Sequence, residues 1–137
     1  MQHEEQEIVH AKHSKIVSLE NAKLREGDYG NFKIHMRGET AMTQKSFAGI
    51  CTVLPGKAVH PAHRHAEEEY LVIMEGEGIW TLDGQEFPAK KGDVLYVEPW
   101  VFHGLTNTGE DNLAFFVVKY APKGLELPNE PKGSHGS

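Results

Sequence analysis

The chain has 137 residues, a length that predicts one domain with a core large enough to be stable without disulfide crosslinks. Its formal net charge is −6, from 14 Lys and Arg against 20 Asp and Glu, and no basic stripe is visible, which argues against nucleic acid as a partner. A single cysteine, Cys51, excludes an intrachain disulfide. The longest apolar run, residues 70–74, is far below the ~20 residues of a membrane helix, so the expected location is the cytoplasm and no membrane contact is expected.

The first third of the chain gives weak signals. Residues 1–15 have mixed charge and are interpreted as a loose arm or an edge strand. Residues 18–27 predict one or two helical turns, with Ser18 as the N-cap and Gly27 as the C-terminal stop. Residues 1–44 are together interpreted as an arm and leading strands that pack on the domain formed by residues 45–120.

From residue 32 onward, short strand-like runs separated by Gly, Pro, Asn and Asp dominate. The predicted strands cover residues 32–36, 45–54, 69–75, 78–82, 85–89, 94–97 and 113–120. Asp83-Gly84, between two of these runs, predicts a type I′ hairpin. Residues 121–137 contain three prolines and three glycines among few apolar residues, which favours a flexible or surface-draped tail.

Many short strands with almost no helix predict an all-β fold, either an antiparallel sandwich or a barrel. A small barrel has an interior that can hold one ligand or one metal ion. Residues 70–74 are apolar at nearly every position. This predicts cover on both faces of that strand, from the barrel interior on one side and from another sheet or subunit on the other.

Four side chains point to a metal site. His63 and His65 are two residues apart, so on a strand they face the same side. Glu69 follows after a short gap, and His103 lies about one hairpin further on. Imidazoles with one carboxylate suit a divalent first-row metal. Strand parity alone would also allow Glu67 as the carboxylate ligand.

Two ordered motifs resemble those of the cupins. The first contains Gly56, His63, His65, Glu69 and Gly76, with one residue more than usual after the first glycine. The second contains Gly92, Pro99, His103 and Asn107. It departs from the family pattern by one extra residue before Pro99, Val101 where Gly is usual, and one residue fewer before His103. The resemblance covers roughly residues 45–120.

The resemblance implies a double-stranded β-helix, or jelly-roll, barrel, here with a short N-terminal helical turn. It implies a metal held by His63, His65, Glu69 and His103, and so selects Glu69 over Glu67. It also implies a homodimer, for which the apolar strand at residues 70–74 and the N-terminal residues offer surface. Asn107 matches the last position of the second motif, but turn formation near Gly109 is the preferred interpretation.

Four protein ligands leave two positions of an octahedral ion open for water or substrate, an arrangement typical of catalytic sites. The ligand types suit Fe, Mn, Ni, Zn, Co or Cu without choosing among them. We therefore expect a metal-dependent enzyme acting on a small molecule that chelates the metal, in a dioxygenase-like oxidation. The alternatives are an isomerase or lyase acting on a sugar or carboxylic acid, and a non-catalytic protein that binds a small ligand.

Other candidates have a structural alternative. His60 and Tyr96 are candidate acid–base groups, against a loop histidine near Pro61 and a buried tyrosine with a backbone partner. Cys51 is interpreted as a small buried hydrophobe. Five aromatic residues are candidate pocket residues, with core packing as the alternative for each. They are Phe47, Trp80, Trp100, Phe102 and Phe116.

Overall fold

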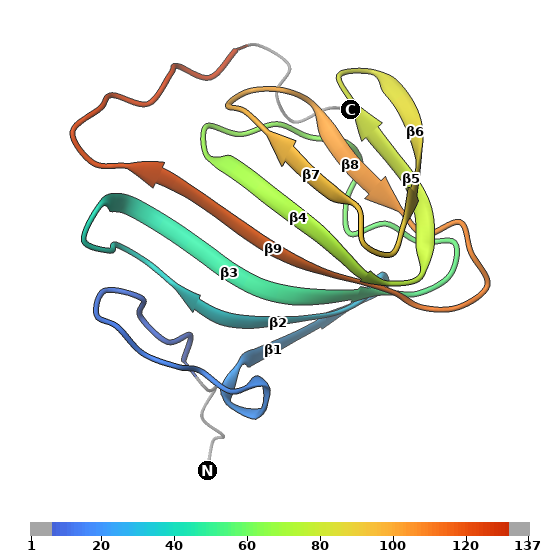
Figure 1. Cartoon of the computed structure of the whole chain (residues 1–137), viewed down its shortest axis with the longest axis horizontal. Helices are drawn as coiled ribbons and strands as arrows, with labels where there is room; N and C mark the ends of the chain where they lie inside the picture. Colours follow the sequence, from blue (N-terminus) through green and yellow to red (C-terminus); the bar gives the residue numbers. More distant parts are fainter. Residues whose placement is uncertain (1–6, 132–137) are drawn as a thin grey trace.

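The computed structural model describes residues 7–131, which form two antiparallel sheets and one short 3-10 turn (Figure 1). The elements are η1 (Leu19–Asn21), β1 (Lys23–Gly27), β2 (Gly30–Arg37), β3 (Thr43–Val53), β4 (Glu68–Glu75), β5 (Glu77–Leu82), β6 (Gln85–Lys90), β7 (Val94–Val97), β8 (His103–Thr106) and β9 (Leu113–Pro122). No helix in this part of the chain is long and apolar enough to cross a membrane.

The two sheets differ in width. The larger sheet has six strands in the order β1-β2-β3-β9-β4-β7, and the smaller has three in the order β6-β5-β8. All pairs of these strands are antiparallel, and the chain passes from one sheet to the other after β4, β6, β7 and β8. Figure 1 shows the long strands of the larger sheet as one curved layer beside β5, β6 and β8. The predicted all-β jelly-roll barrel is confirmed.

The core lies between the sheets and follows the two-residue alternation of each strand. In β4, Leu71 and Ile73 are buried, whereas Tyr70 and Met74 point outward and are 44% and 42% exposed. No second sheet of the described chain covers this outer face. The predicted cover on both faces therefore does not arise within one chain, and a second subunit stays a prediction. The buried cluster comprises Cys51, Val53, Leu71, Ile73, Trp80, Ala89, Leu95, Leu105, Leu113, Phe115 and Val117.

The predicted N-terminal helical turn is present but shorter than expected. It covers only Leu19–Asn21, and the following residues form β1, which pairs with β2. Gly27 therefore ends a strand, not a helix. Ser18 is the N-cap residue, but its hydroxyl makes no capping hydrogen bond to the backbone and instead accepts one from the Asn21 side-chain amide at 3.1 Å. Pairing with β2 satisfies the backbone of residues 23–27 in a way that an isolated helical turn cannot.

Two turns show why glycine is required. The β5–β6 hairpin has φ of 51° at Asp83 and 82° at Gly84, so the predicted type I′ turn is confirmed. Gly76, the last residue of the first motif, has φ of 87°, and a Cβ there would lie 2.6 Å from the Asn112 carbonyl oxygen. Only glycine fits both conditions.

Both ends of the described chain are attached to the larger sheet. Near the N-terminus, the Arg37 amide donates to the Val9 carbonyl at 3.0 Å. Strand β9 continues to Pro122, whose carbonyl accepts a hydrogen bond from the Gln44 side-chain amide at 2.9 Å. Further on, the Trp100 indole donates to the Pro128 carbonyl at 2.9 Å. Residues 1–6 of the predicted arm and 132–137 of the predicted tail lie outside the described residues.

Candidate metal centre

Three histidines from two segments meet near the N-terminal end of β4. His63 and His65 lie in the loop between β3 and β4, and His103 is the first residue of β8. The backbone amides of His63 and His103 each donate to the other's carbonyl, at 3.0 and 2.9 Å, which fixes the loop against the strand. One ligand nitrogen from each of the three imidazoles lies within 4.8 Å of the other two.

Glu69 places a carboxylate against this cluster. Its Oε1 lies 2.7 Å from His65 Nε2 and 3.4 Å from His103 Nε2, and the residue is 6% exposed. Burial alone would raise the pKa of Glu69. Interaction with the His103 and His65 rings outweighs burial and holds the pKa of Glu69 well below its usual range. The centre therefore contains an ionised carboxylate.

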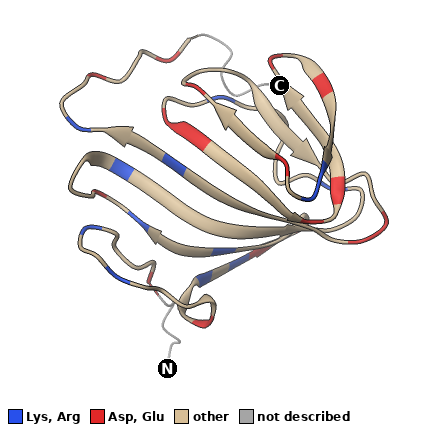
Figure 2. Cartoon of the chain, viewed as in Figure 1, with Lys and Arg blue, Asp and Glu red and all other residues tan. Residues whose placement is uncertain are grey.

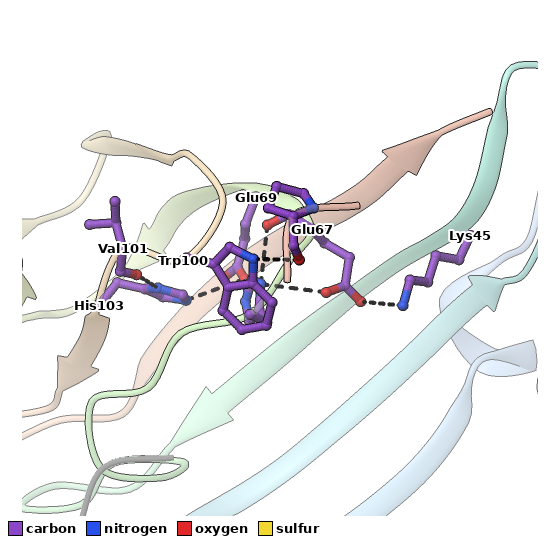
Figure 3. A network of polar contacts seen from close by, with 8 residues as sticks. Lys45, Glu67, Glu69, Trp100, Val101 and His103 are labelled. Atoms are coloured by element: carbon purple, nitrogen blue, oxygen red, sulfur yellow. Dashed lines mark hydrogen bonds and ion pairs between the residues drawn. The ribbon is translucent and has the colours of Figure 1, made fainter. Parts of the chain in front are cut away.

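Backbone carbonyls orient two of the imidazoles. The Nδ1 of His65 lies 3.1 Å from the Glu67 carbonyl oxygen. The Nδ1 of His103 lies 2.9 Å from the Val101 carbonyl oxygen, a contact that Figure 3 shows. Because a carbonyl oxygen can only accept, Nδ1 is the donor in each case and Nε2 faces the centre. Hydrogen bonds of this kind commonly fix the tautomer and direction of metal-binding histidines.

Two further observations support a metal ion as the partner of these side chains. His103 Nε2 is buried and has no hydrogen-bond partner among the described residues, since its 3.4 Å contact with Glu69 is not aligned as a hydrogen bond. A buried nitrogen without a partner is costly unless something binds it. Burial, with repulsion from the neighbouring histidines, lowers the pKa of His63 to about 3, so this imidazole is neutral at pH 7 and its lone pair is available.

The structure brings Glu69, and not Glu67, to the Nε2 atoms of His65 and His103. The Glu67 carboxylate lies beside the Lys45 ammonium at 3.6 Å (Figure 3), and a second contact of 3.7 Å joins it to His65 Nδ1. Residues 63–67 form a loop instead of a strand, so the parity that allowed Glu67 does not apply. The family motif selected the carboxylate that the fold brings to the centre.

A cavity of about 210 Å³, called here the metal cavity, opens from this centre into the barrel. Its wall includes three of the candidate metal ligands, and most of the remaining lining is apolar. Lys119 is its single Lys or Arg. The lining residues are Phe32, Phe47, Val59, His60, His63, Glu69, Leu71, Leu95, His103, Gly104, Leu105, Phe115, Val117 and Lys119.

Of the five predicted pocket aromatics, only Phe47 lines the metal cavity. Trp80 belongs to the buried core, and the Phe102 ring lies under the Arg64 guanidinium at 4.4 Å. The Trp100 indole is hydrogen-bonded to the Pro128 carbonyl in the C-terminal segment. Phe116 lies on the outer face of β9, because its neighbour Phe115 points inward.

Phe32, Phe115 and Lys119 are cavity residues that the sequence did not suggest. Period-two alternation along residues 113–119 would have selected Phe115 and Lys119 once the buried Leu113 was assigned. Nothing in the sequence pattern of residues 30–37 distinguishes Phe32.

The two candidate acid–base residues lie in different places. The His60 ring stacks on that of His63 with centroids 3.8 Å apart, at the solvent-exposed rim of the metal cavity. Desolvation lowers the pKa of His60. Tyr96 is 44% exposed on the outer face of β7, where its hydroxyl donates to Glu68 at 2.6 Å and this bond raises the pKa of Tyr96 to about 12. Tyr96 therefore cannot contact a ligand in the metal cavity, because β7 presents alternate residues to opposite faces.

Comparison with known proteins now identifies the family. The family model described as a cupin domain matches residues 49–119, which include all four candidate metal ligands. The chain belongs to the cupin family. A cupin 2 conserved barrel domain protein from Salinispora arenicola has a similar structure, with a TM-score of 0.62 and 25% identity over 80% of this chain and 90% of that one.

Two curated relatives differ in how much of them the chain spans. A gentisate 1,2-dioxygenase from a Streptomyces species is 33% identical over 53% of this chain but only 19% of its own length. An oxalate-binding protein from Thermotoga maritima is 32% identical over 61% of this chain and 70% of its own length. The chain thus spans about a fifth to a quarter of the gentisate dioxygenases it matches, at 19% and 25% of two of them.

Proposed function

We propose that this cupin binds one divalent transition metal through His63, His65, Glu69 and His103 and acts on a small organic acid in a dioxygenase-like reaction. The observation that carries the proposal is the convergence of three imidazoles and an ionised carboxylate at the wall of an open, mostly apolar cavity. Similarity to gentisate dioxygenases over the barrel supports the reaction class.

The donor set fits a first-row metal from Mn to Zn, and four protein ligands leave room for a substrate oxygen. A metal bound there would supply Lewis-acid polarisation and, if it is redox-active like Fe(II), access to dioxygen chemistry. The protein's own residues supply binding and water exclusion. The Lys119 ammonium attracts a carboxylate, and Phe32 and Phe115 exclude water from the cavity wall.

His60 is the proposed proton acceptor. Its Nδ1 lies 2.8 Å from the Pro61 carbonyl oxygen, so Nδ1 donates and Nε2 keeps a free lone pair. The lowered pKa keeps the ring neutral at pH 7. A neutral imidazole at the cavity rim can take a proton from an entering acid or phenol and pass it to water.

Ligand binding without turnover is the second candidate function. Among the described lining residues of the metal cavity, the titratable groups other than the metal ligands are only His60 and Lys119. A sparse set of acid–base groups suits a protein that holds a chelating acid without converting it. The 70% coverage of the Thermotoga maritima relative, whose name states that it binds oxalate, favours the same candidate.

Metal content and oxygen uptake test the proposal together. Purified protein is analysed for metal, reconstituted anaerobically with Fe(II), and assayed for oxygen consumption with gentisate, diketones and flavonols. We expect one metal per chain and substrate-dependent uptake that Glu69→Ala and His103→Ala abolish, while the exposed His13→Ala does not. Stoichiometric oxalate binding without uptake would favour the binding protein. Equal metal content in His103→Ala and wild type would contradict the metal site itself.

A further inference from the structure

A second and larger cavity, of about 590 Å³, lies beside the metal cavity on the concave face of the larger sheet. We call it the basic cavity. Its charged lining consists of five cationic side chains against two carboxylates, in a chain whose net charge is −6. Figure 2 shows the cationic positions on β1, β2, β3 and β9, side by side across the sheet. The cations are Lys23, Arg25, Arg37, Lys45 and Lys119, and the carboxylates are Glu7 and Glu67.

Strand register makes the basic cavity continuous with the metal centre. Glu69 on β4 pairs with Lys119 on β9, Lys119 pairs with Phe47 on β3, and Phe47 pairs with Arg37 on β2. Directly opposed residues project to the same face of a sheet. One row of side chains therefore runs from the carboxylate of the metal centre to Arg37. Phe47 and Lys119 line both cavities.

The charged groups of the basic cavity are not equally available to a ligand. Lys45 is held 3.6 Å from Glu67, and the Lys119 ammonium lies 5.3 Å from the centroid of the Phe47 ring. Arg25 and Arg37 have no ion-pair partner among residues 7–131. A guanidinium offers a planar fork of donors that matches a carboxylate or a phosphate. The two arginines are therefore the groups best suited to bind an external anion.

We propose that the ligand of this protein is an elongated organic anion whose oxygen donors reach the metal centre and whose distal carboxylate or phosphate binds Arg25 and Arg37 in the basic cavity. This inference rests on the proposed function for the inner end of the ligand. Its outer end rests on the charge and register of the larger sheet alone.

The geometry sets the length of such a ligand. Three inter-strand steps separate Glu69 from Arg37, which corresponds to about 14 Å between their Cα atoms. Side chains reach inward from both ends and shorten the gap that a ligand must span. Phe47 lies along the way, and Phe32 packs edge-on against it with ring centroids 5.5 Å apart. The middle of the ligand is accordingly expected to be apolar.

Calorimetric titration of the 137-residue chain, with and without Co(II), tests the inference with three probes of similar length. Octanoate has one anionic end, suberate has two carboxylates, and 6-phosphohexanoate has a carboxylate and a phosphate. We expect suberate or 6-phosphohexanoate to bind at least tenfold more tightly than octanoate, with the advantage falling as salt rises. The tighter of the two identifies the distal group.

Variants separate the basic cavity from the metal centre. Arg25→Gln and Arg37→Gln should each reduce the affinity of the preferred two-ended probe about tenfold and leave octanoate unchanged. Lys33→Gln is the matched control, because Lys33 lies on β2 beside Phe32 and projects to the opposite face. If Arg37→Gln lowers the affinity for the two-ended probe equally in metal-free and metal-loaded protein, that result would support anion binding in the basic cavity and contradict the proposed metal-dependent function.

Two results would overturn the inference. One is equal affinity for octanoate and both two-ended probes, or no binding of either two-ended probe at millimolar concentration. The other is a loss in Lys33→Gln as large as that in Arg37→Gln, because the effect would then come from overall charge. In both cases the metal content and oxygen uptake described above could still support the proposed function.

Discussion

Glu69 and Lys119 are register partners on β4 and β9, and both line the metal cavity. A carboxylate that belongs to the candidate metal site thus has an ammonium on the neighbouring strand, facing the same interior. A candidate metal ligand and a cation are thus built into one pair of the same ladder. In the proposed function, an acid that enters the metal cavity would therefore meet a cation on the strand next to Glu69.

This pairing predicts a separation of ligand affinity from metal affinity. Replacing Lys119 with Met removes the cation and keeps the length of the side chain. We expect an unchanged metal content and about a tenfold loss of oxalate affinity, as for a lost hydrogen bond to a charged group. Metal analysis and calorimetry on the same samples measure both quantities. Lys33→Met, on the outer face of β2, is the control, and a loss of metal in Lys119→Met would contradict the separation.

Asn107 predicts a stability effect at the last position of the second motif. The residue is fully buried, and its amide donates to the carbonyls of Val53 and Asp111 at 2.8 and 2.9 Å, while its Oδ1 accepts from the Gly109 amide at 2.9 Å. Asn107→Ala leaves these buried groups without partners and should cost about 3 kcal/mol in the free energy of unfolding. Urea denaturation measures the loss. The exposed Asn112→Ala should cost far less, and similar losses in both would refute a bonding role for Asn107.

Two glycines with similar backbone angles predict different costs on substitution. Gly76 has φ of 87° and a Cβ site blocked by the Asn112 carbonyl, whereas Gly92 has φ of 93° and no atom within 4 Å of its Cβ site. Gly92→Ala should cost about 1 kcal/mol from backbone strain alone. Gly76→Ala adds a clash with backbone and should cost about 2 kcal/mol more. Thermal unfolding of the two variants gives the comparison, and equal costs would show that the turn at Gly76 relaxes.

Cys51 predicts both a reactivity and a dependence of stability on pH. The thiol is buried, and desolvation raises its pKa to about 12. Native protein at pH 8 should therefore resist iodoacetamide until it unfolds. A raised pKa stabilises the folded state fully below the unfolded value of 9.0 and progressively less as pH rises toward 12.

The change from pH 8 to pH 10 isolates this contribution. It should cost about 1 kcal/mol more in wild type than in Cys51→Ala, because only the wild-type unfolded chain gains a thiolate. Urea denaturation of both proteins at the two pH values measures the difference. Rapid alkylation of the native protein, or an identical pH dependence in the variant, would show that the thiol is accessible.

The strands were predictable where alternation and turn residues agree. The predicted run at 94–97 coincides with β7, and the Asp83-Gly84 turn fixes the β5–β6 register. Strand β1 was missed because Leu, Lys, Arg and Glu favour helix locally, and pairing with β2 overrides that preference. Strand β8 was missed because four residues that include Gly104 give no periodic signal.

The site was predictable to the extent that sequence order carries it. Two ordered motifs placed the four candidate metal ligands. The face on which an aromatic residue lies was not predictable where neighbours are both apolar, as at Phe115 and Phe116, since register alone decides it. The basic cavity was not predictable, because its cations form no continuous basic run in the sequence. Its cations come from four separate strands and become neighbours only through pairing of β1, β2, β3 and β9.

The division of the larger sheet has an evolutionary consequence. The candidate metal ligands come from β4, β8 and the loop before β4, whereas half of the residues lining the basic cavity come from β1, β2 and β3. Among the described residues the two linings have only Phe47 and Lys119 in common. In the proposed arrangement, substitutions at Arg25 and Arg37 would change which compound binds without altering a candidate metal ligand. Relatives that keep the same candidate metal ligands could thus differ in substrate preference through substitutions in the basic cavity.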